Sequence, residues 1–190
     1  MTESSDIPSS ASTTGWRRRH WLGTAVAAAA VLGGAGLAWR TNRARQGDRV
    51  IDPAFWQLVF SKPDGVMLHM DELRNKPLLL NFWATWCPPC VQEMPLLSGF
   101  HDLNAAKGWK VLGIAVDSID PVQRFLLQNP VTFPVVLAGA SGIELSRTLG
   151  NLVGVLPFTL VLGSDGVVRH RKIGALTTDE LKAWANPSDV

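Results

Sequence analysis

The feature that most restricts the fold is a pair of cysteines, Cys87 and Cys90, which are the only two in the 190-residue chain. An apolar run over residues 76–83 precedes them, and a helix-compatible stretch follows. This order of strand, short loop and helix places the first sulfur at a helix N-terminus. Unpaired N–H groups and the positive end of the helix dipole favour a thiolate there. A thiolate beside a second thiol is the chemical requirement for thiol–disulfide exchange.

Two other uses of the cysteine pair have weaker support. A structural disulfide normally joins distant segments, whereas this one closes a loop of a few residues and stabilises little through chain entropy. A structural zinc site takes four ligands, usually with a second Cys or His pair. No two of the four histidines lie at ligand spacing: His20, His69, His101 and His170. The sequence therefore favours a redox pair and predicts neither a metal site nor a cofactor.

The ten residues Asn81–Cys90 read NFWATWCPPC and are followed by Glu93 and Pro95. In this block the chain resembles the TlpA/ResA group of thioredoxin-like proteins. The resemblance implies an α/β thioredoxin-like fold, with a central mixed sheet flanked by helices, and thiol–disulfide oxidoreductase activity. It covers residues 55–185 and continues through Gly113–Asp117, Leu156–Leu162 and Asp165–Gly166.

The two cysteines are predicted to have different roles. Cys87 is the expected nucleophile, because it precedes the helix and is the more exposed sulfur in this geometry. Cys90 lies within the first turn, is more buried, and is expected to resolve the mixed disulfide that forms on Cys87. Trp86 is interpreted as a cover for the exposed thiol and as partner-contacting surface, since Trp is frequent at interfaces. A plain core residue is the alternative for Trp86.

A second part of the site is predicted at Pro157, because the thioredoxin-like family carries a cis-proline here, opposite the two cysteines. The resemblance implies that the backbone of Leu156 pairs with an incoming peptide strand beside this proline. An ordinary edge-strand proline is the alternative. Phe158 is included in the predicted partner-binding surface, although the family commonly has a small polar residue there. Gly154 also lies one residue further from the proline than is usual in the family.

Asn81 differs from thioredoxin itself, which has an aspartate at the matching buried position. Asn cannot titrate, so proton transfer to or from Cys90 needs water or another group. Glu93 is the nearest acid in sequence, one helical turn beyond Cys90, and TlpA/ResA-like proteins often carry an acid here. Glu93 is therefore predicted as a catalytic residue. The alternative is a solvated helix charge, as most surface carboxylates are.

The remaining pattern alternates β and α elements, as expected for a sheet covered by helices on both faces. The near-continuous apolar run at 78–83 is typical of a strand in such a sheet. Two hairpins are predicted, from residues 55–60 with 66–68 and from 158–162 with 167–173. Further strands are predicted over 111–116 and 135–137, and helices over 88–106, 120–129 and 143–149, with a last helix capped by Thr177 or Thr178.

The N-terminal part has a different composition. Residues 1–15 are rich in Ser, Thr and Ala and are expected to be disordered. Residues 16–40 are predicted to be a transmembrane anchor or signal segment. Their core, residues 21–39, has no formal charge and a tryptophan at each end, and it nearly matches the ~20 residues that span a bilayer. A cleaved signal peptide is the alternative, and a loose twin-arginine pattern precedes the run. Residues 41–54 are predicted as a linker and 55–187 as the thioredoxin-like domain.

The net charge of +2 is unevenly distributed along the chain. Residues 1–45 hold six arginines and two acids, whereas the rest of the chain holds more acids than bases. The predicted domain is thus mildly acidic. A nucleic-acid partner has no support, because such binding needs a basic face on the folded domain.

Together these features predict a membrane-anchored oxidoreductase of a bacterial envelope, with its domain facing the periplasm. It would reduce disulfides in partner proteins, with electrons from a thiol reductase of the inner membrane. By resemblance, apocytochrome c thiols and other envelope disulfides are candidate substrates. A disulfide donor is the alternative within the same class. A copper-binding thiol chaperone, with Cys87 and Cys90 as soft ligands, is the alternative from another class, although only Met94 is close enough to add a ligand.

Overall fold

The computed structural model describes residues 50–185. The predicted tail (1–15), the anchor or signal segment (16–40) and most of the predicted linker (41–54) lie outside the described residues. Among the helices of residues 50–185, none combines the length and apolar character needed to cross a membrane.

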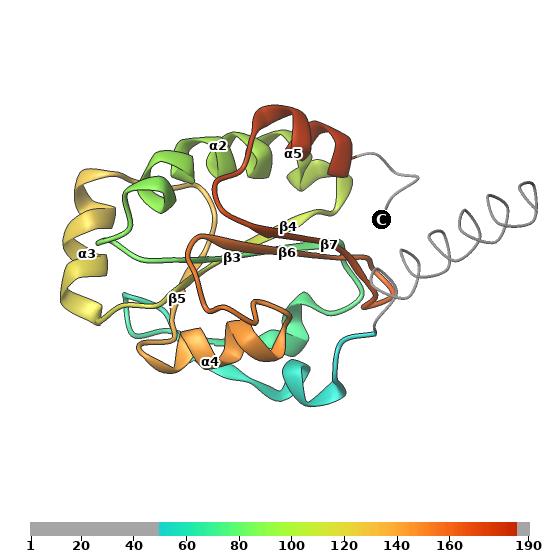
Figure 1. The fold of residues 1–190 in the computed structure, drawn as a ribbon, viewed down its shortest axis with the longest axis horizontal. Helices are drawn as coiled ribbons and strands as arrows, with labels where there is room; N and C mark the ends of the chain where they lie inside the picture. The colour runs from blue at the N-terminus through green and yellow to red at the C-terminus, as the bar shows by residue number, and fades with distance from the viewer. Residues whose placement is uncertain (1–49, 186–190) are drawn as a thin grey trace, which may run out of the picture. The chain divides into compact units, whose positions relative to one another are not determined.

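Residues 50–185 contain a seven-stranded mixed sheet with the order β2-β1-β5-β4-β3-β6-β7 (Figure 1). Its centre is parallel, because β3 pairs with β4 and β4 pairs with β5, while β6 joins the other side of β3 antiparallel. The strands are β1 (Val59–Ser61), β2 (Met67–His69), β3 (Leu78–Trp83), β4 (Lys110–Ala115), β5 (Val135–Leu137), β6 (Phe158–Leu162) and β7 (Val168–Ile173). This is the thioredoxin-like α/β arrangement that the sequence predicts.

Helices cover both faces of this sheet (Figure 1). In the described part of the chain, α2 (Pro88–Asn104) and α5 (Thr178–Trp184) lie together on one face, and α4 (Ser141–Thr148) lies on the other. Helix α3 (Ile119–Gln128) lies at the end of the sheet from which α2 starts. Three short 3-10 helices are η1 (Pro53–Gln57), η2 (Met70–Leu73) and η3 (Ala105–Lys107).

Strand β3 is buried on both faces along its whole length. Leu80 and Phe82 belong to the hydrophobic cluster on the α4 side, whereas Leu79 and Trp83 belong to the cluster under α2 and α5. Because side chains alternate across a strand, six consecutive buried residues require cover on both faces. Each fully buried Leu or Phe contributes roughly 1.5–3 kcal/mol to the stability of the fold. The end of β3 is therefore a rigid base for the loop that carries the cysteines.

The folded domain begins before residue 55, the predicted boundary. Ile51 is buried, and its N–H donates to the carbonyl of Gly166 at 3.0 Å. Val50 forms an isolated bridge with Val167. Residues 50–54, predicted as part of the linker, thus belong to the domain.

The hairpin predicted from residues 55–60 is wrong in its first half. Residues 53–57 form η1, and the strand begins only at Val59. The side chain of Asp52 accepts a hydrogen bond from the N–H of Ala54 at 2.8 Å, and Pro53 occupies the first helical turn. A capping Asp followed by Pro favours a helical turn over an extended start.

Candidate redox site

The two cysteines lie where β3 leads into α2, as the sequence predicts. The N–H of Cys87 donates to the carbonyl of Ala84 at 3.2 Å, which closes the turn after the strand. Cys87 is the N-cap residue of α2, with extended backbone (φ −104°, ψ 100°). Pro88 and Pro89 follow in the first turn, where an N–H would have no intrahelical partner. Cys87 is thus placed at the positive end of the helix dipole.

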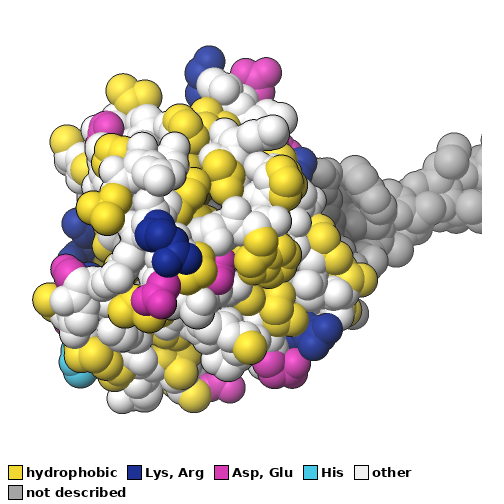
Figure 2. All heavy atoms as spheres, turned by 90° about the vertical axis from the view of Figure 1, so that its left-hand side faces the viewer, with side chains coloured by type: hydrophobic (Ala, Val, Ile, Leu, Met, Phe, Trp, Pro, Cys, Tyr) yellow, Lys and Arg dark blue, Asp and Glu magenta, His cyan; other side chains and the backbone are white. Residues whose placement is uncertain are grey.

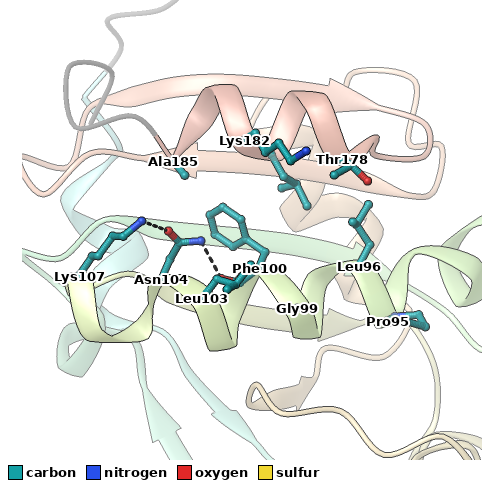
Figure 3. A pocket seen from close by; sticks show the side chains of 11 residues that line it. Pro95, Leu96, Gly99, Phe100, Leu103, Asn104, Lys107, Thr178, Lys182 and Ala185 are labelled. Atoms are coloured by element: carbon teal, nitrogen blue, oxygen red, sulfur yellow. Dashed lines mark hydrogen bonds between the residues drawn. The ribbon is translucent and has the colours of Figure 1, made fainter.

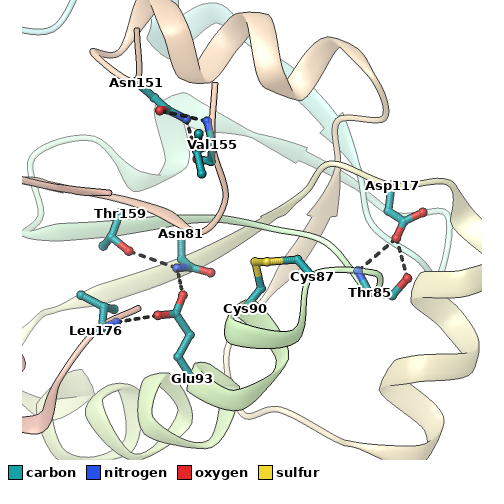
Figure 4. Close-up of a disulfide and its surroundings, with 10 residues drawn as sticks. All are labelled: Asn81, Thr85, Cys87, Cys90, Glu93, Asp117, Asn151, Val155, Thr159 and Leu176. Carbon is teal, nitrogen blue, oxygen red and sulfur yellow. Dashed lines mark hydrogen bonds between the residues drawn. A yellow bond between two sulfur atoms is a disulfide. The ribbon is translucent and has the colours of Figure 1, made fainter. Parts of the chain in front are cut away.

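Cys87 and Cys90 form a disulfide, with a Cα–Cα distance of 5.3 Å (Figure 4). This distance is ordinary for bridged cysteines. Cys87 is 5% exposed and Cys90 is fully buried, at 0%. The order of exposure is the one expected for a nucleophile and a resolving thiol, although both sulfurs are well covered in the oxidised pair.

Asp117 holds the loop ahead of the cysteines, a role that the motif around the cysteines does not predict. Its Oδ2 accepts hydrogen bonds from the N–H of Thr85 at 3.1 Å and from the Thr85 hydroxyl at 2.6 Å (Figure 4). Its Oδ1 accepts from the N–H of Ser118 at 2.8 Å. The sequence does contain a signal for this role, because Asp117 comes just after strand β4. The carboxyl ends of neighbouring parallel strands meet at one edge of a sheet, which places Asp117 near the loop after β3.

Glu93 lies inside the domain and is only 3% exposed. Its Oε1 accepts a hydrogen bond from the side-chain amide of Asn81 at 2.7 Å, and its Oε2 accepts from the N–H of Leu176 at 2.8 Å (Figure 4). Burial raises the pKa of the Glu93 carboxyl above its usual range, and the hydrogen bonds from Leu176 and Asn81 oppose this rise. The alternative of a solvated helix charge is therefore wrong. A buried carboxyl with a raised pKa is suited to proton transfer nearer neutral pH.

The Leu156–Pro157 peptide bond is cis, as predicted. Pro157 is buried and immediately precedes β6, whose first residue, Phe158, lies opposite Phe82 of β3. This register brings Pro157 beside the end of β3, where the loop to the cysteines begins. Pro157 and the loop that carries the cysteine pair thus lie at the same end of the sheet.

Phe158 is not part of a partner-binding surface. It is fully buried, and its ring lies 5.8 Å from that of Phe82, centroid to centroid. The pleat of β6 turns this side chain into the cluster on the α4 side of the sheet. The substrate-binding role predicted for Phe158 is therefore wrong.

Trp86 is 64% exposed, so the alternative of a core residue is wrong.

The loop before Pro157 has further exposed apolar side chains, Leu152, Val153 and Val155. Buried Asn151 shapes this loop, because its amide donates to the Val155 carbonyl at 2.9 Å and accepts from the Val155 N–H at 3.3 Å (Figure 4). Figure 2 looks at the end of the domain where β3 leads into α2 and shows several hydrophobic side chains there. From the sequence, these three apolar loop residues can be assigned to the site only once Pro157 is known to lie beside the cysteines.

Residues 50–185 contain no cluster of three or more His, Cys, Asp or Glu side chains that could hold a metal. A groove of about 560 Å³ lies between α2 and α5 (Figure 3). None of the predicted site residues lines it. Its walls are mainly apolar, with two lysines, and consist of Pro95, Leu96, Gly99, Phe100, Leu103, Asn104, Lys107, Thr178, Leu181, Lys182 and Ala185.

The fold and the cysteine pair define a thiol–disulfide oxidoreductase of the thioredoxin-like class. The model of the Redoxin family matches residues 46–186, and the chain belongs to this family. The chain is 32% identical over 122 residues to thiol-disulfide oxidoreductase ResA of Bacillus thuringiensis (strain Al Hakam), which covers 64% of this chain and 68% of that one. The predicted resemblance to the TlpA/ResA group and the predicted enzyme class are thus confirmed.

Solved structures give the same result. The thioredoxin-related protein from Neisseria meningitidis serogroup B is 32% identical, with a TM-score of 0.59, and the match covers 67% of this chain and 96% of that one. StoA from Bacillus subtilis is 26% identical, with a TM-score of 0.56, over 68% of this chain and 96% of that one. These similarities support the thioredoxin-like fold described above.

Proposed function

We propose that this oxidoreductase reduces disulfides of partner proteins in a bacterial envelope. The observation that carries the proposal is the position of Cys87. It is the N-cap residue of α2, follows the exposed Trp86 in the sequence and forms a disulfide with Cys90. A thiolate formed there is stabilised by the helix N-terminus, and an exposed aromatic neighbour offers contact area to a protein substrate.

The proposed reaction begins with the reduced pair. The Cys87 thiolate attacks one sulfur of the partner's disulfide, forms a mixed disulfide and releases the other partner thiol. Cys90 then attacks Cys87, which restores the Cys87–Cys90 disulfide and releases the second partner thiol. Two electrons pass from the cysteine pair to the partner, and a membrane thiol reductase would return the pair to the dithiol.

Glu93 is proposed to take the proton that Cys90 loses when it attacks the mixed disulfide. Support comes from its burial, its raised pKa and its place one helical turn after Cys90 on α2. A carboxyl with a raised pKa is a better proton acceptor near neutral pH than an ordinary surface glutamate.

Leu156 and Pro157 are proposed to hold the partner's chain beside Cys87. Pro157 precedes β6 and carries no N–H, so the backbone of Leu156 is available to pair with an extended segment. Exposed apolar side chains of the same loop would contact residues that flank the partner's cysteine.

The residues between the cysteines support the reducing direction. Pro88 and Pro89 remove both intervening N–H donors, and buried Glu93 adds negative charge when it is ionised, so the Cys87 thiolate is only modestly stabilised. A less stabilised reduced form makes a weaker oxidant. We expect a reduction potential nearer the thioredoxin end of the scale (~−270 mV) than the strongly oxidising end (~−120 mV).

Equilibration with a glutathione redox buffer, read by mass spectrometry after alkylation, tests this direction. Insulin reduction should accompany a low potential, and Cys87→Ala should abolish it. A potential above about −150 mV on the same scale would make the protein a disulfide donor instead. Capture of mixed disulfides with a Cys90→Ser variant would identify the partners.

The location is proposed from the N-terminal residues. Residues 16–40 would anchor the protein in the inner membrane, because residues 21–39 form an uncharged run close to the ~20 residues that span a bilayer. Reporters that work only in the periplasm or only in the cytoplasm, fused after residue 190, distinguish the two sides. A protein recovered outside the membrane fraction, with a new N-terminus near residue 39, would show a cleaved signal instead.

A further inference from the structure

Asn81 is the polar residue at the centre of β3, and it is fully buried. Its amide nitrogen donates to Glu93 Oε1 at 2.7 Å and to the Thr159 hydroxyl oxygen at 3.1 Å. Thr159 lies directly opposite Asn81 in the β3–β6 pairing. When Glu93 is ionised, its carboxylate can only accept, and the amide then presents its nitrogen to Glu93. In this orientation both hydrogen-bond partners of the Asn81 amide, Glu93 and Thr159, lie on its nitrogen.

The side-chain oxygen of Asn81 is left without a hydrogen-bond partner in the described structure. Figure 4 shows it directed toward the side of the disulfide, away from Glu93 and Thr159. A buried acceptor without a donor destabilises the state in which it occurs, and such groups in native proteins usually have a reason. The oxidised cysteine pair cannot supply a donor, because neither sulfur of a disulfide carries a proton.

Reduction of the Cys87–Cys90 disulfide changes which hydrogen-bond donors are present near Asn81. Breaking the disulfide adds two electrons, and the sulfurs then carry protons or negative charge. Cys90 is the fully buried member, packed in the apolar cluster under α2. Burial in apolar surroundings favours the neutral thiol over the thiolate. Reduction therefore creates an S–H donor on the side of the site toward which the unpartnered oxygen of Asn81 points (Figure 4).

We propose that Asn81 is a positioning residue of the redox site, whose side-chain oxygen accepts a hydrogen bond from the Cys90 thiol in the reduced protein. The same amide holds Glu93 through its nitrogen, so one side chain orients both the resolving thiol and the buried carboxyl. This inference rests on the redox role of the cysteine pair and is independent of the direction of electron flow. Because the bond exists only after reduction, it favours the reduced form.

A spectroscopic test addresses the bond itself. In full-length protein with Cys87→Ser, Cys90 is the single remaining thiol, so the infrared S–H stretching band belongs to it alone. The band should lie at the lower wavenumber of a hydrogen-bonded thiol. Adding Asn81→Leu, which has a similar shape and no acceptor, should move the band to the position of a free thiol. Adding Thr159→Val instead removes only one of the two acceptors of the amide nitrogen, keeps the Asn81 oxygen, and should leave the band in place.

An equilibrium measurement gives a second readout. With both cysteines present, Asn81→Leu should lower the equilibrium constant for reduction by glutathione by about tenfold, the scale of one lost buried hydrogen bond, while Thr159→Val should change it much less. A free-thiol band in the Cys87→Ser protein overturns the proposal, even if the Asn81→Leu proteins do not fold. So does an unchanged band or an unchanged equilibrium constant in a folded Asn81→Leu protein. A high potential of the unsubstituted protein would overturn the reducing direction and leave the bond to Asn81 untouched.

Discussion

Two identical thiols differ here only in their surroundings, and that difference is measurable. Both sulfurs border the apolar cluster under α2, but Cys87 is the N-cap residue of α2 and is 5% exposed, whereas Cys90 lies within the helix and is 0% exposed. After reduction we expect iodoacetamide to label Cys87 first and at lower pH, because the thiolate is the reactive form. Peptide mass spectrometry across a pH series reads the two sites separately. Preferential labelling of Cys90 would reverse the assigned roles.

Glu93 should make the stability of the domain depend on pH. Its pKa is raised in the folded protein, chiefly by burial, so at pH values between the unfolded and folded pKa the native state holds a proton that the unfolded chain releases. The free energy of unfolding therefore falls as the pH rises through this window and levels off above the folded pKa. Glu93→Gln cannot titrate and should lack this decline.

Urea unfolding of the oxidised protein at a series of pH values measures the effect. Glu144 on α4 provides a matched control, because its side chain is 72% exposed. Glu144→Gln should keep the pH slope of the unsubstituted protein. Parallel slopes for Glu93→Gln and the unsubstituted protein would show that Glu93 does not carry the dependence.

At the scale of elements, α5 supports the site through its first residues. The Thr177 hydroxyl accepts from the Glu180 N–H at 3.3 Å, and the Glu180 carboxylate accepts from the Thr177 N–H at 2.9 Å, which is a capping box. The preceding residue, Leu176, donates its N–H to Glu93. The cap thus fixes the segment that holds one oxygen of the buried carboxyl.

Replacing the N-cap residue of α5, Thr177, should lower the free energy of unfolding. We expect Thr177→Ala to lower the free energy of unfolding by about 0.5–2 kcal/mol, the usual range for a lost N-cap. Thr178→Ala is the control, because Thr178 is exposed and is not the cap residue. Chemical denaturation of both variants separates the two residues. Equal losses would mean that the capping box contributes little beyond a general effect of the substitution.

The sequence predicts those elements best whose signals are local. The final helix cap, the strand at 135–137 and the strand–cysteine–helix unit all follow from neighbouring residues, and the structure confirms them. One error is local, because the Asp52–Pro53 cap of η1 was missed in the hairpin predicted from residues 55–60. The misses at the site concern relations between distant segments. Phe158 was assignable to the core only from its pairing with β3, and Asp117 to the cysteine loop only from the parallel register of β3 and β4. The sequence alone could not show whether Glu93 is solvated or buried, because its hydrogen-bond donors, Asn81 and Leu176, lie on other segments.

At the scale of the whole domain, the site depends on four segments that are far apart in the sequence. Residues 81–93 supply the cysteines, Glu93 and Asn81. Asp117 comes from the end of β4, Pro157 from the start of β6, and Leu176 from the segment before α5. No one segment holds the site by itself, so its geometry requires β3, β4, β6 and the segment before α5 to be assembled together.

This requirement makes the N-terminal boundary of the domain testable. Ile51 is buried in the core cluster, and residues 50–51 contact the turn between β6 and β7. A fragment of residues 46–190 should fold and reduce insulin, whereas a fragment of residues 55–190, the boundary that the sequence alone predicts, loses this contact. Burial of one Ile contributes roughly 1.5–3 kcal/mol, so the shorter fragment should be less stable by at least that amount.

Urea unfolding of the two fragments provides the comparison, and Ile51→Ala in the longer fragment is the matched control. That substitution keeps the chain length and removes only the buried side chain, with an expected loss of about 2–5 kcal/mol for an aliphatic core residue cut to Ala. If Ile51→Ala reproduces most of the loss seen in residues 55–190, the core contact is the cause. If the fragment of residues 55–190 is as stable as that of residues 46–190, residues 50–54 are dispensable and the boundary at residue 55 is correct.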